Sequence, residues 1–184
     1  KLLTWRNRRE ELVEGIHRIA ADVGGMSHLQ DKPAQGEPHP LKDICPFTTM
    51  GLFNRSLTDA NRKVIAARLA DLLGVNEPVP DSFDGIPLLN NQKSWFFAYE
   101  KTRTDNDIEF LWEMFTQAIR FADDPDVDPG AFSIVYDVTS NVHNVGWNLT
   151  MGLYWIRPWF YPTLDSQSQY YIQKVLNIKI LKNG

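Results

Sequence analysis

The sequence is poor in cysteine and has no long hydrophobic run. Cys45 is the only cysteine among 184 residues, which excludes a scaffold held together by disulfides. No stretch of about 18 apolar residues is present, so we expect no membrane-spanning helix. Residues 1–11 are highly charged and unlike a signal peptide, and we expect a cytoplasmic protein. Because an initiator methionine is also missing, we expect the sequence to be part of a longer chain.

Several motifs of enzymes and metal sites are missing as well. There is no G-x-x-x-x-G-K-[ST] loop, no G-x-G-x-x-G loop and no G-x-S-x-G motif. The four histidines are scattered without the spacing of metal ligands. Cys45 lies beside Pro46 and Phe47, where a small buried apolar role is favoured over that of a nucleophile. We therefore expect no catalytic residue, no cofactor and no metal in these residues.

The composition favours one packed domain of helices. Hydrophobic residues make up 43% of the chain, enough for a core. Apolar spacing predicts a first helix within residues 5–23, and further helices at 59–73, 105–122, 132–138, 147–155 and 165–176. Residues 86–99 fit either a short strand or the start of a buried helix. The fold class is thus mainly α, or α+β with a small sheet, in a single compact domain of six to seven helices.

The expected organisation has three parts. Residues 1–26 hold the N-terminal helix, 27–43 form a loop, and 44–184 form a mainly helical domain on which the first helix packs. The loop is long enough to be functional or a mobile connector. We expect Ser56 or Thr58 to cap the helix at 59–73, and Gly74 to end it. Asp165 is favoured as a helix cap over a catalytic acid.

Charge is unevenly distributed along the chain. The formal net charge is −4, but residues 104–128 hold eight acidic side chains and one basic side chain, Arg120. All other residues together therefore carry a net positive charge. Bases also outnumber the single acid, Asp165, in residues 141–184. This asymmetry allows a basic working face beside an acidic one.

Two clusters combine aromatic and polar side chains. In the first, Asn90, Asn91, Gln92 and Lys93 come shortly before Trp95. Amide groups match the hydrogen-bonding edge of a base, and a neighbouring ring can stack on that base. The alternative is a polar loop followed by aromatic residues of the core.

The second cluster brings three rings and a guanidinium together, from Trp155, Arg157, Trp159 and Tyr161. Arg157 can hold a phosphate or stack on a ring. The alternative is a core helix in which Gly152 allows close packing.

Three runs carry a resemblance to a known family. They are DICPFTTMGLFNR at 43–55, FDGIPLLNNQKSWFF at 83–97, and WNLTMGLYWIRP at 147–158 followed by Leu164-Asp-Ser166. In this order they resemble the N-terminal region of McrB-type proteins, the AAA+ GTPase subunits of modification-dependent restriction systems. The resemblance covers roughly residues 31–172. It implies a non-catalytic DNA-recognition module, with a GTPase domain in the same chain and a separate nuclease subunit. Some such modules read methylated cytosine by flipping it.

The leading hypothesis is therefore a module that binds double-stranded DNA, reading modified cytosine or a specific site. The candidate DNA-binding residues are Asn90, Asn91, Gln92, Lys93, Trp95, Arg103, Arg157, Trp159, Tyr161 and Lys174. A second hypothesis is an enzyme acting on a base or nucleotide through Asp165. A third is an assembly module in which the acidic helix at 105–123 meets a basic partner.

Overall fold

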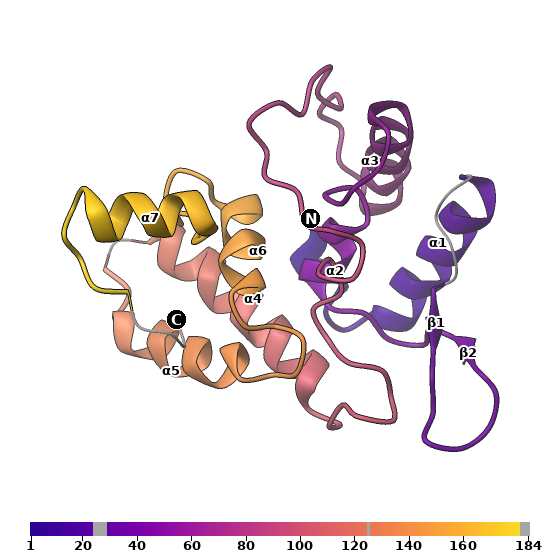
Figure 1. The fold of residues 1–184 in the computed structure, drawn as a ribbon. Helices are drawn as coiled ribbons and strands as arrows, with labels where there is room; N and C mark the ends of the chain where they lie inside the picture. Colours follow the sequence, from indigo (N-terminus) through magenta and orange to yellow (C-terminus); the bar gives the residue numbers. More distant parts are fainter. Residues whose placement is uncertain (24–28, 125, 181–184) are drawn as a thin grey trace.

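The structure, a computed structural model, describes residues 1–23, 29–124 and 126–180 (Figure 1). Within these ranges it has seven α-helices, one short 3-10 helix and a two-stranded antiparallel sheet, which confirms the predicted fold class. The elements are η1 Leu2–Trp5, α1 Arg9–Asp22, β1 Gln30–Asp31, β2 His39–Pro40, α2 Pro46–Gly51, α3 Asp59–Leu73, α4 Asp107–Asp123, α5 Pro129–Ser140, α6 Asn148–Ile156 and α7 Ser166–Lys174.

Local capping signals set several helix ends. The Thr58 hydroxyl accepts a hydrogen bond from the Asn61 N–H at the start of α3, and Gly74 ends this helix with a φ of 66°. The carboxylate of Asp165 accepts from the Ser168 N–H at the start of α7. Both capping predictions are confirmed, and Asp165 acts as the N-cap of α7.

Two predictions need correction. The first helix begins at Arg9 instead of residue 5, because Leu2–Trp5 form a separate 3-10 turn. Residues 86–99 form neither a helix nor a regular strand. They run in successive turns, with one isolated bridge between Arg55 and Leu89. The side chains of Asn90 and Ser94 bond nearby backbone groups in this segment, and such bonds favour turns over regular structure.

The segment expected to be a loop contains the sheet. Gln30 pairs with Pro40, and Asp31 pairs with His39, in a short hairpin. The predicted boundary between residues 26 and 27 lies outside the described residues, as does the end of the chain beyond residue 180.

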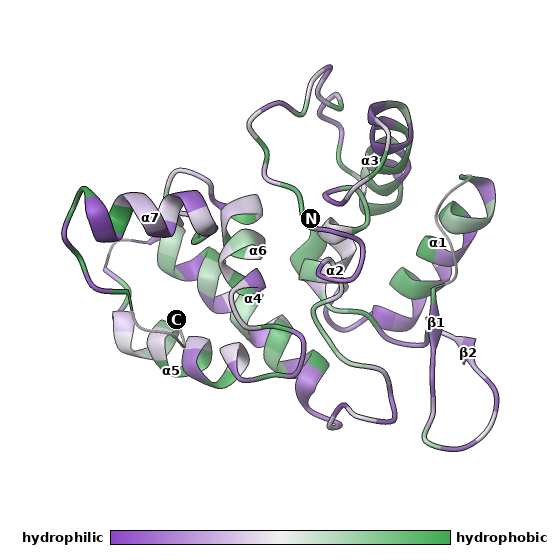
Figure 2. Cartoon of the chain, in the orientation of Figure 1, coloured by the Kyte–Doolittle hydropathy of each residue, from purple (hydrophilic) through white to green (hydrophobic). Residues whose placement is uncertain are grey.

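The core surrounds α4, which contacts α2, α5 and α6. Trp112 of α4 is fully buried, and its indole N–H donates to the Ile44 carbonyl at 2.9 Å. A Cβ atom at Gly152 of α6 would lie 2.5 Å from the Phe47 ring of α2, so the glycine allows these helices to approach closely, as predicted. Figure 2 shows hydrophobic residues along α2, α4 and α6, and a hydrophilic β1–β2 hairpin.

The acidic side chains of α4 are paired within the chain. Glu109 forms ion pairs with Arg6 and Arg9, and Glu113 pairs with Arg6. At the other end of the helix, Asp123 pairs with Arg157. The excess of acid in this part of the sequence is therefore partly neutralised by bases that are distant along the chain.

Among the described helices, none combines the length and the apolar character that crossing a membrane requires.

Candidate functional site

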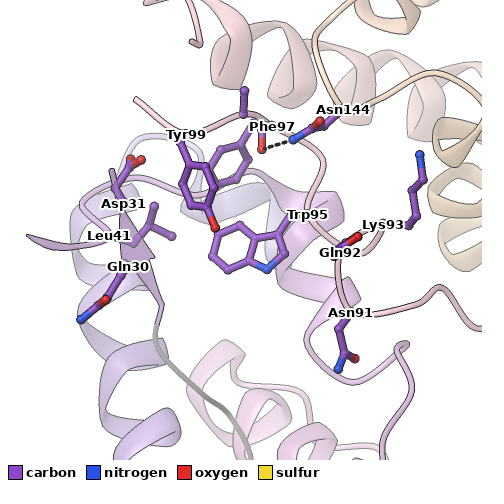
Figure 3. Close-up of a pocket in the computed structure, with 11 residues that line it drawn as sticks. Gln30, Asp31, Leu41, Asn91, Gln92, Lys93, Trp95, Phe97, Tyr99 and Asn144 are labelled. Carbon is purple, nitrogen blue, oxygen red and sulfur yellow. Dashed lines mark hydrogen bonds between the residues drawn. The ribbon is translucent and has the colours of Figure 1, made fainter. Parts of the chain in front are cut away.

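A pocket of about 420 Å³ brings the first aromatic cluster together with the β1–β2 hairpin (Figure 3). Four of the predicted residues line it: Asn91, Gln92, Lys93 and Trp95. The other lining residues are Gln30, Asp31, Leu41, Phe97, Ala98, Tyr99 and Asn144. The pocket therefore joins three segments that are far apart in the sequence.

A tight turn presents the amides at one wall of the pocket. The Asn90 side-chain oxygen accepts from the Lys93 N–H at 2.8 Å, so Asn90 shapes the turn from within. The buried Ser94 hydroxyl donates to the Asn91 carbonyl. With these bonds made inside the turn, the side chains of Asn91, Gln92 and Lys93 remain exposed.

The run Trp95-Phe96-Phe97 alternates between two sides. Trp95 and Phe97 face the pocket, with ring centroids 5.6 Å apart in an edge-to-face arrangement. Phe96 is fully buried and meets Trp155 on the other side. Its N–H donates to the Thr48 hydroxyl, which fixes the run against α2. One ring of the predicted cluster, Trp95, is thus half-buried at the site, while its neighbour belongs to the core.

The opposite wall depends on Asp31, whose side chain is 2% exposed. The carboxylate accepts hydrogen bonds from the Lys32 N–H, the Glu100 N–H and the Arg103 guanidinium. Burial raises the pKa of Asp31, but these hydrogen bonds together outweigh burial and hold that pKa below its usual value. Asp31 therefore ties the hairpin to the segment that follows the aromatic run.

Two further residues with side-chain amides line the pocket. Asn144 has a φ of 75°, in the left-handed region, and its side-chain amide donates to the Phe97 carbonyl at 3.4 Å. Gln30 contributes a second amide from the hairpin. In Figure 3 the rings of Trp95 and Tyr99 lie between Gln30 and Asp31 on one side and residues 91–93 on the other.

Exposed lysines flank the rings. The Lys32 ammonium lies 4.7 Å from the centre of the Tyr99 ring, and Lys101 is joined to Lys32 by a backbone hydrogen bond. Lys93 points away from the Trp95 ring in Figure 3. Lysine side chains around a base-binding surface most often contact the phosphates of a nucleic acid and not its bases.

Sequence reasoning missed Gln30, Lys32, Tyr99 and Asn144. Tyr99 is the last residue of the aromatic run 95–99, so the sequence pattern could have identified it. The other three carry no sequence signal, because folding alone brings the hairpin and the α5–α6 connection to the turn at 90–95.

Three predicted residues have partners inside the fold and do not line this pocket. Arg103 is mostly buried and bonded to Asp31 and the Ala98 carbonyl. Arg157 forms a two-point ion pair with Asp123 at 2.6 and 2.5 Å. Tyr161 is buried, and its hydroxyl donates to the Ala118 carbonyl at 2.7 Å. Each of these groups satisfies a partner inside the fold.

The two remaining candidates lie outside the pocket. Trp159 is 101% exposed and lines a different cavity with Trp155. Lys174 is exposed at the last turn of α7. The two clusters predicted from the sequence therefore do not form one surface.

Cys45 is fully buried, and burial raises the pKa of its thiol to about 12. The thiol accepts a hydrogen bond from the Thr48 N–H at the start of α2. This confirms the interpretation of Cys45 as a buried residue. In the part of the chain that the structure describes, no cluster of three or more His, Cys, Asp or Glu side chains is placed to hold a metal ion.

A model of one protein family, described as a domain of unknown function (DUF8425), matches residues 1–184. No curated protein and no solved structure matches the sequence.

Proposed function

The chain belongs to the DUF8425 family, and we propose that it is a DNA-recognition module whose base-contacting surface is the pocket around Trp95. One observation carries the proposal. Residues with side-chain amides from three separate segments, Gln30, Asn91 and Asn144, line the same pocket as two rings, Trp95 and Tyr99.

The chemistry of this surface suits a nucleic-acid base. A base is a flat ring with hydrogen-bond donors and acceptors on its edge. Aromatic side chains stack on the face of such a ring, and side-chain amides match its edge. The pocket volume of about 420 Å³ falls within the range of about 300–1,000 Å³ that is usual for small-ligand sites.

Electrostatics set the expected strength of binding. The exposed lysines at positions 32, 93 and 101 belong to the segments around the pocket and can contact phosphates, while the net charge of −4 opposes general attraction to DNA. We therefore expect weak binding to plain duplex. Affinity has to come from contacts with a particular base, modified or not.

The resemblance to McrB-type proteins extends this proposal. It supports modified cytosine as the base that is read, and a cytoplasmic restriction complex as the setting. In that setting a GTPase domain of the same chain and a separate nuclease subunit perform the chemistry, and this module is non-catalytic.

The test is fluorescence-anisotropy titration of duplexes that carry cytosine, 5-methylcytosine or 5-hydroxymethylcytosine, at two salt concentrations. Tyr99→Ala and Trp95→Ala should each weaken binding by about 1–3 kcal/mol, the cost of losing a stacking ring. Tyr170→Ala removes an exposed ring of α7 outside the pocket and is the matched control.

A preference for one modified duplex that persists at the higher salt would support a reader of that base. If the wild-type chain binds none of the duplexes, or if Tyr170→Ala weakens binding as much as Tyr99→Ala, the assignment to this pocket is wrong. A change in mass on adding a partner subunit, without DNA binding, would instead favour the assembly hypothesis.

A further inference from the structure

A second cavity, of about 240 Å³, lies between α2, the loop at residue 86 and α6. Its walls are mostly aromatic and apolar, and they include Phe53, Ile86, Trp155 and Trp159. It shares no lining residue with the pocket around Trp95. Among the described residues, no Asp, Glu, Lys, Arg or His side chain lines it.

One buried amide, that of Asn54, opens onto this cavity. Asn54 is 3% exposed, and its side chain lies 2.6 Å from the Arg62 guanidinium. A guanidinium carries only donors, so the Asn54 atom that faces it must be the oxygen, Oδ1. The other end of the amide, Nδ2, is thereby directed away from Arg62.

The Nδ2 group of Asn54 carries two N–H donors. Within the residues that the structure describes, no hydrogen bond is made by Asn54 Nδ2, and it is not among the side-chain atoms sealed from solvent. A buried donor without a partner costs about 1–3 kcal/mol. Contact with the cavity relieves that cost and offers a donor to whatever enters.

The position of Arg62 sets the orientation of the Asn54 amide. It is buried, and its guanidinium lies 4.1 Å from the centre of the Phe83 ring. Among the described residues it forms no ion pair within bonding distance, and burial lowers its pKa. The amide oxygen of Asn54 is therefore a main polar partner of a costly buried cation, which fixes the amide orientation firmly.

One aromatic wall of the cavity, Trp155, is fixed by its own contacts. The Trp155 indole N–H donates to the Pro87 carbonyl at 3.0 Å, and its ring meets Phe96 edge to face. Trp159, by contrast, is fully exposed at the rim. A fixed ring on one wall and a free ring at the rim provide faces on which a flat ligand can stack.

We propose that this cavity binds a single uncharged aromatic heterocycle whose carbonyl oxygen accepts a hydrogen bond from Asn54 Nδ2. The volume is below the usual range of about 300–1,000 Å³ for ligand sites, which favours one ring over a whole nucleotide. The described lining residues carry no charge, which favours a neutral ligand, and the Asn54 donor favours an acceptor on the ring edge. This site is independent of the DNA-binding proposal.

The experiment is NMR titration of the ¹⁵N-labelled chain with uracil, with uridine and with benzene. Uracil should shift the side-chain amide signal of Asn54 and the indole signal of Trp159 in a saturable way. Benzene has the ring without the carbonyl and should bind more weakly. Uridine distinguishes a free base from a base that carries a sugar.

Asn54→Asp is the decisive variant. It keeps an oxygen for Arg62, so the fold is retained, but it replaces the donor with a second acceptor. Uracil binding, followed by the Trp159 signal, should weaken by at least about tenfold, the effect of one lost hydrogen bond. Trp159→Ala, at a fully exposed position, should weaken binding without changing stability, and Tyr99→Ala in the other pocket should leave it unchanged.

Saturable binding of uracil that Asn54→Asp removes supports the proposal, with or without binding of uridine. Absence of uracil binding overturns it. It is also overturned if benzene binds as well as uracil, or if Asn54→Asp binds uracil like the wild-type chain.

Discussion

The Arg103 guanidinium and the Asp31 carboxylate form an ion pair of 2.6 Å between the β1–β2 hairpin and the segment after the aromatic run. Asp31 is almost fully buried and Arg103 mostly so. Asp31 belongs to the wall of the proposed DNA-binding pocket, and this pair holds that wall in place. Arg103 thus supports the wall of the site through Asp31.

Replacing Asp31 should destabilise the fold. Asp31→Asn leaves the guanidinium without its counter-charge, and breaking a buried pair in this way costs about 3–5 kcal/mol. Because Arg103 retains some contact with solvent, we expect a loss near the lower end, about 3 kcal/mol. Urea denaturation of both proteins at neutral pH measures it. A loss below about 0.5 kcal/mol would show that the pair has no structural role.

The same pair predicts how stability depends on acid. Hydrogen bonding lowers the pKa of folded Asp31 below the unfolded value of about 3.9. Its stabilising contribution is therefore complete above pH 4 and is lost as pH falls through the lower folded pKa. The difference in unfolding free energy between the wild-type chain and Asp31→Asn should shrink below pH 4. A difference that stays constant down to pH 2 would contradict this.

Arg157 and Lys93 should differ in their effect on DNA binding. Arg157 is already paired with Asp123, so Arg157→Ala should leave the DNA affinity and its salt dependence nearly unchanged. Its cost in stability should be about 0–1 kcal/mol, as for exposed pairs. Lys93→Ala should reduce the salt slope of binding by about one. The reverse ranking in anisotropy titrations would return the phosphate contact to Arg157.

Cys45 should make the protein sensitive to alkali. The unfolded thiol ionises near pH 9, whereas burial raises the pKa of the folded thiol to about 12. The unfolded state therefore loses a proton that the folded state keeps, and stability falls by about 1.4 kcal/mol per pH unit between these values. Cys45→Ala lacks this contribution, so its stability should fall less steeply from pH 9 to 11. Parallel slopes in urea titrations would exclude an effect of the thiol.

Gly51 should be essential for the position of the turn at 90–95. A Cβ atom at Gly51 would lie 2.6 Å from the Ser94 carbonyl oxygen, which cannot yield without moving the backbone. Gly51→Ala should therefore cost about 1–3 kcal/mol and shift the Trp95 indole signal. Gly152→Ala is the matched control, since its Cβ meets the Phe47 ring instead. It should destabilise the fold and leave the Trp95 signal in place.

Helix prediction succeeded where local physics is sufficient. The helix at 59–73 matches α3 to the residue, because Thr58 and Gly74 provide strong start and stop signals. The helix predicted at 105–122 from its apolar stripe matches α4 within two residues. Residues 86–99 were not predictable in the same way, since their turns depend on bonds to Thr48 and on the bridge from Leu89 to Arg55.

The candidate site was likewise predictable only where its residues are neighbours in the sequence. The sequence alone determined that amides and a ring would be adjacent at 90–95, since neighbours in the chain stay neighbours in space. Only the tertiary structure decided which charges remain available. Arg103 and Arg157 meet Asp31 and Asp123 across separations of 72 and 34 residues. Ion pairing over such separations follows from packing, and no local pattern of residues encodes it.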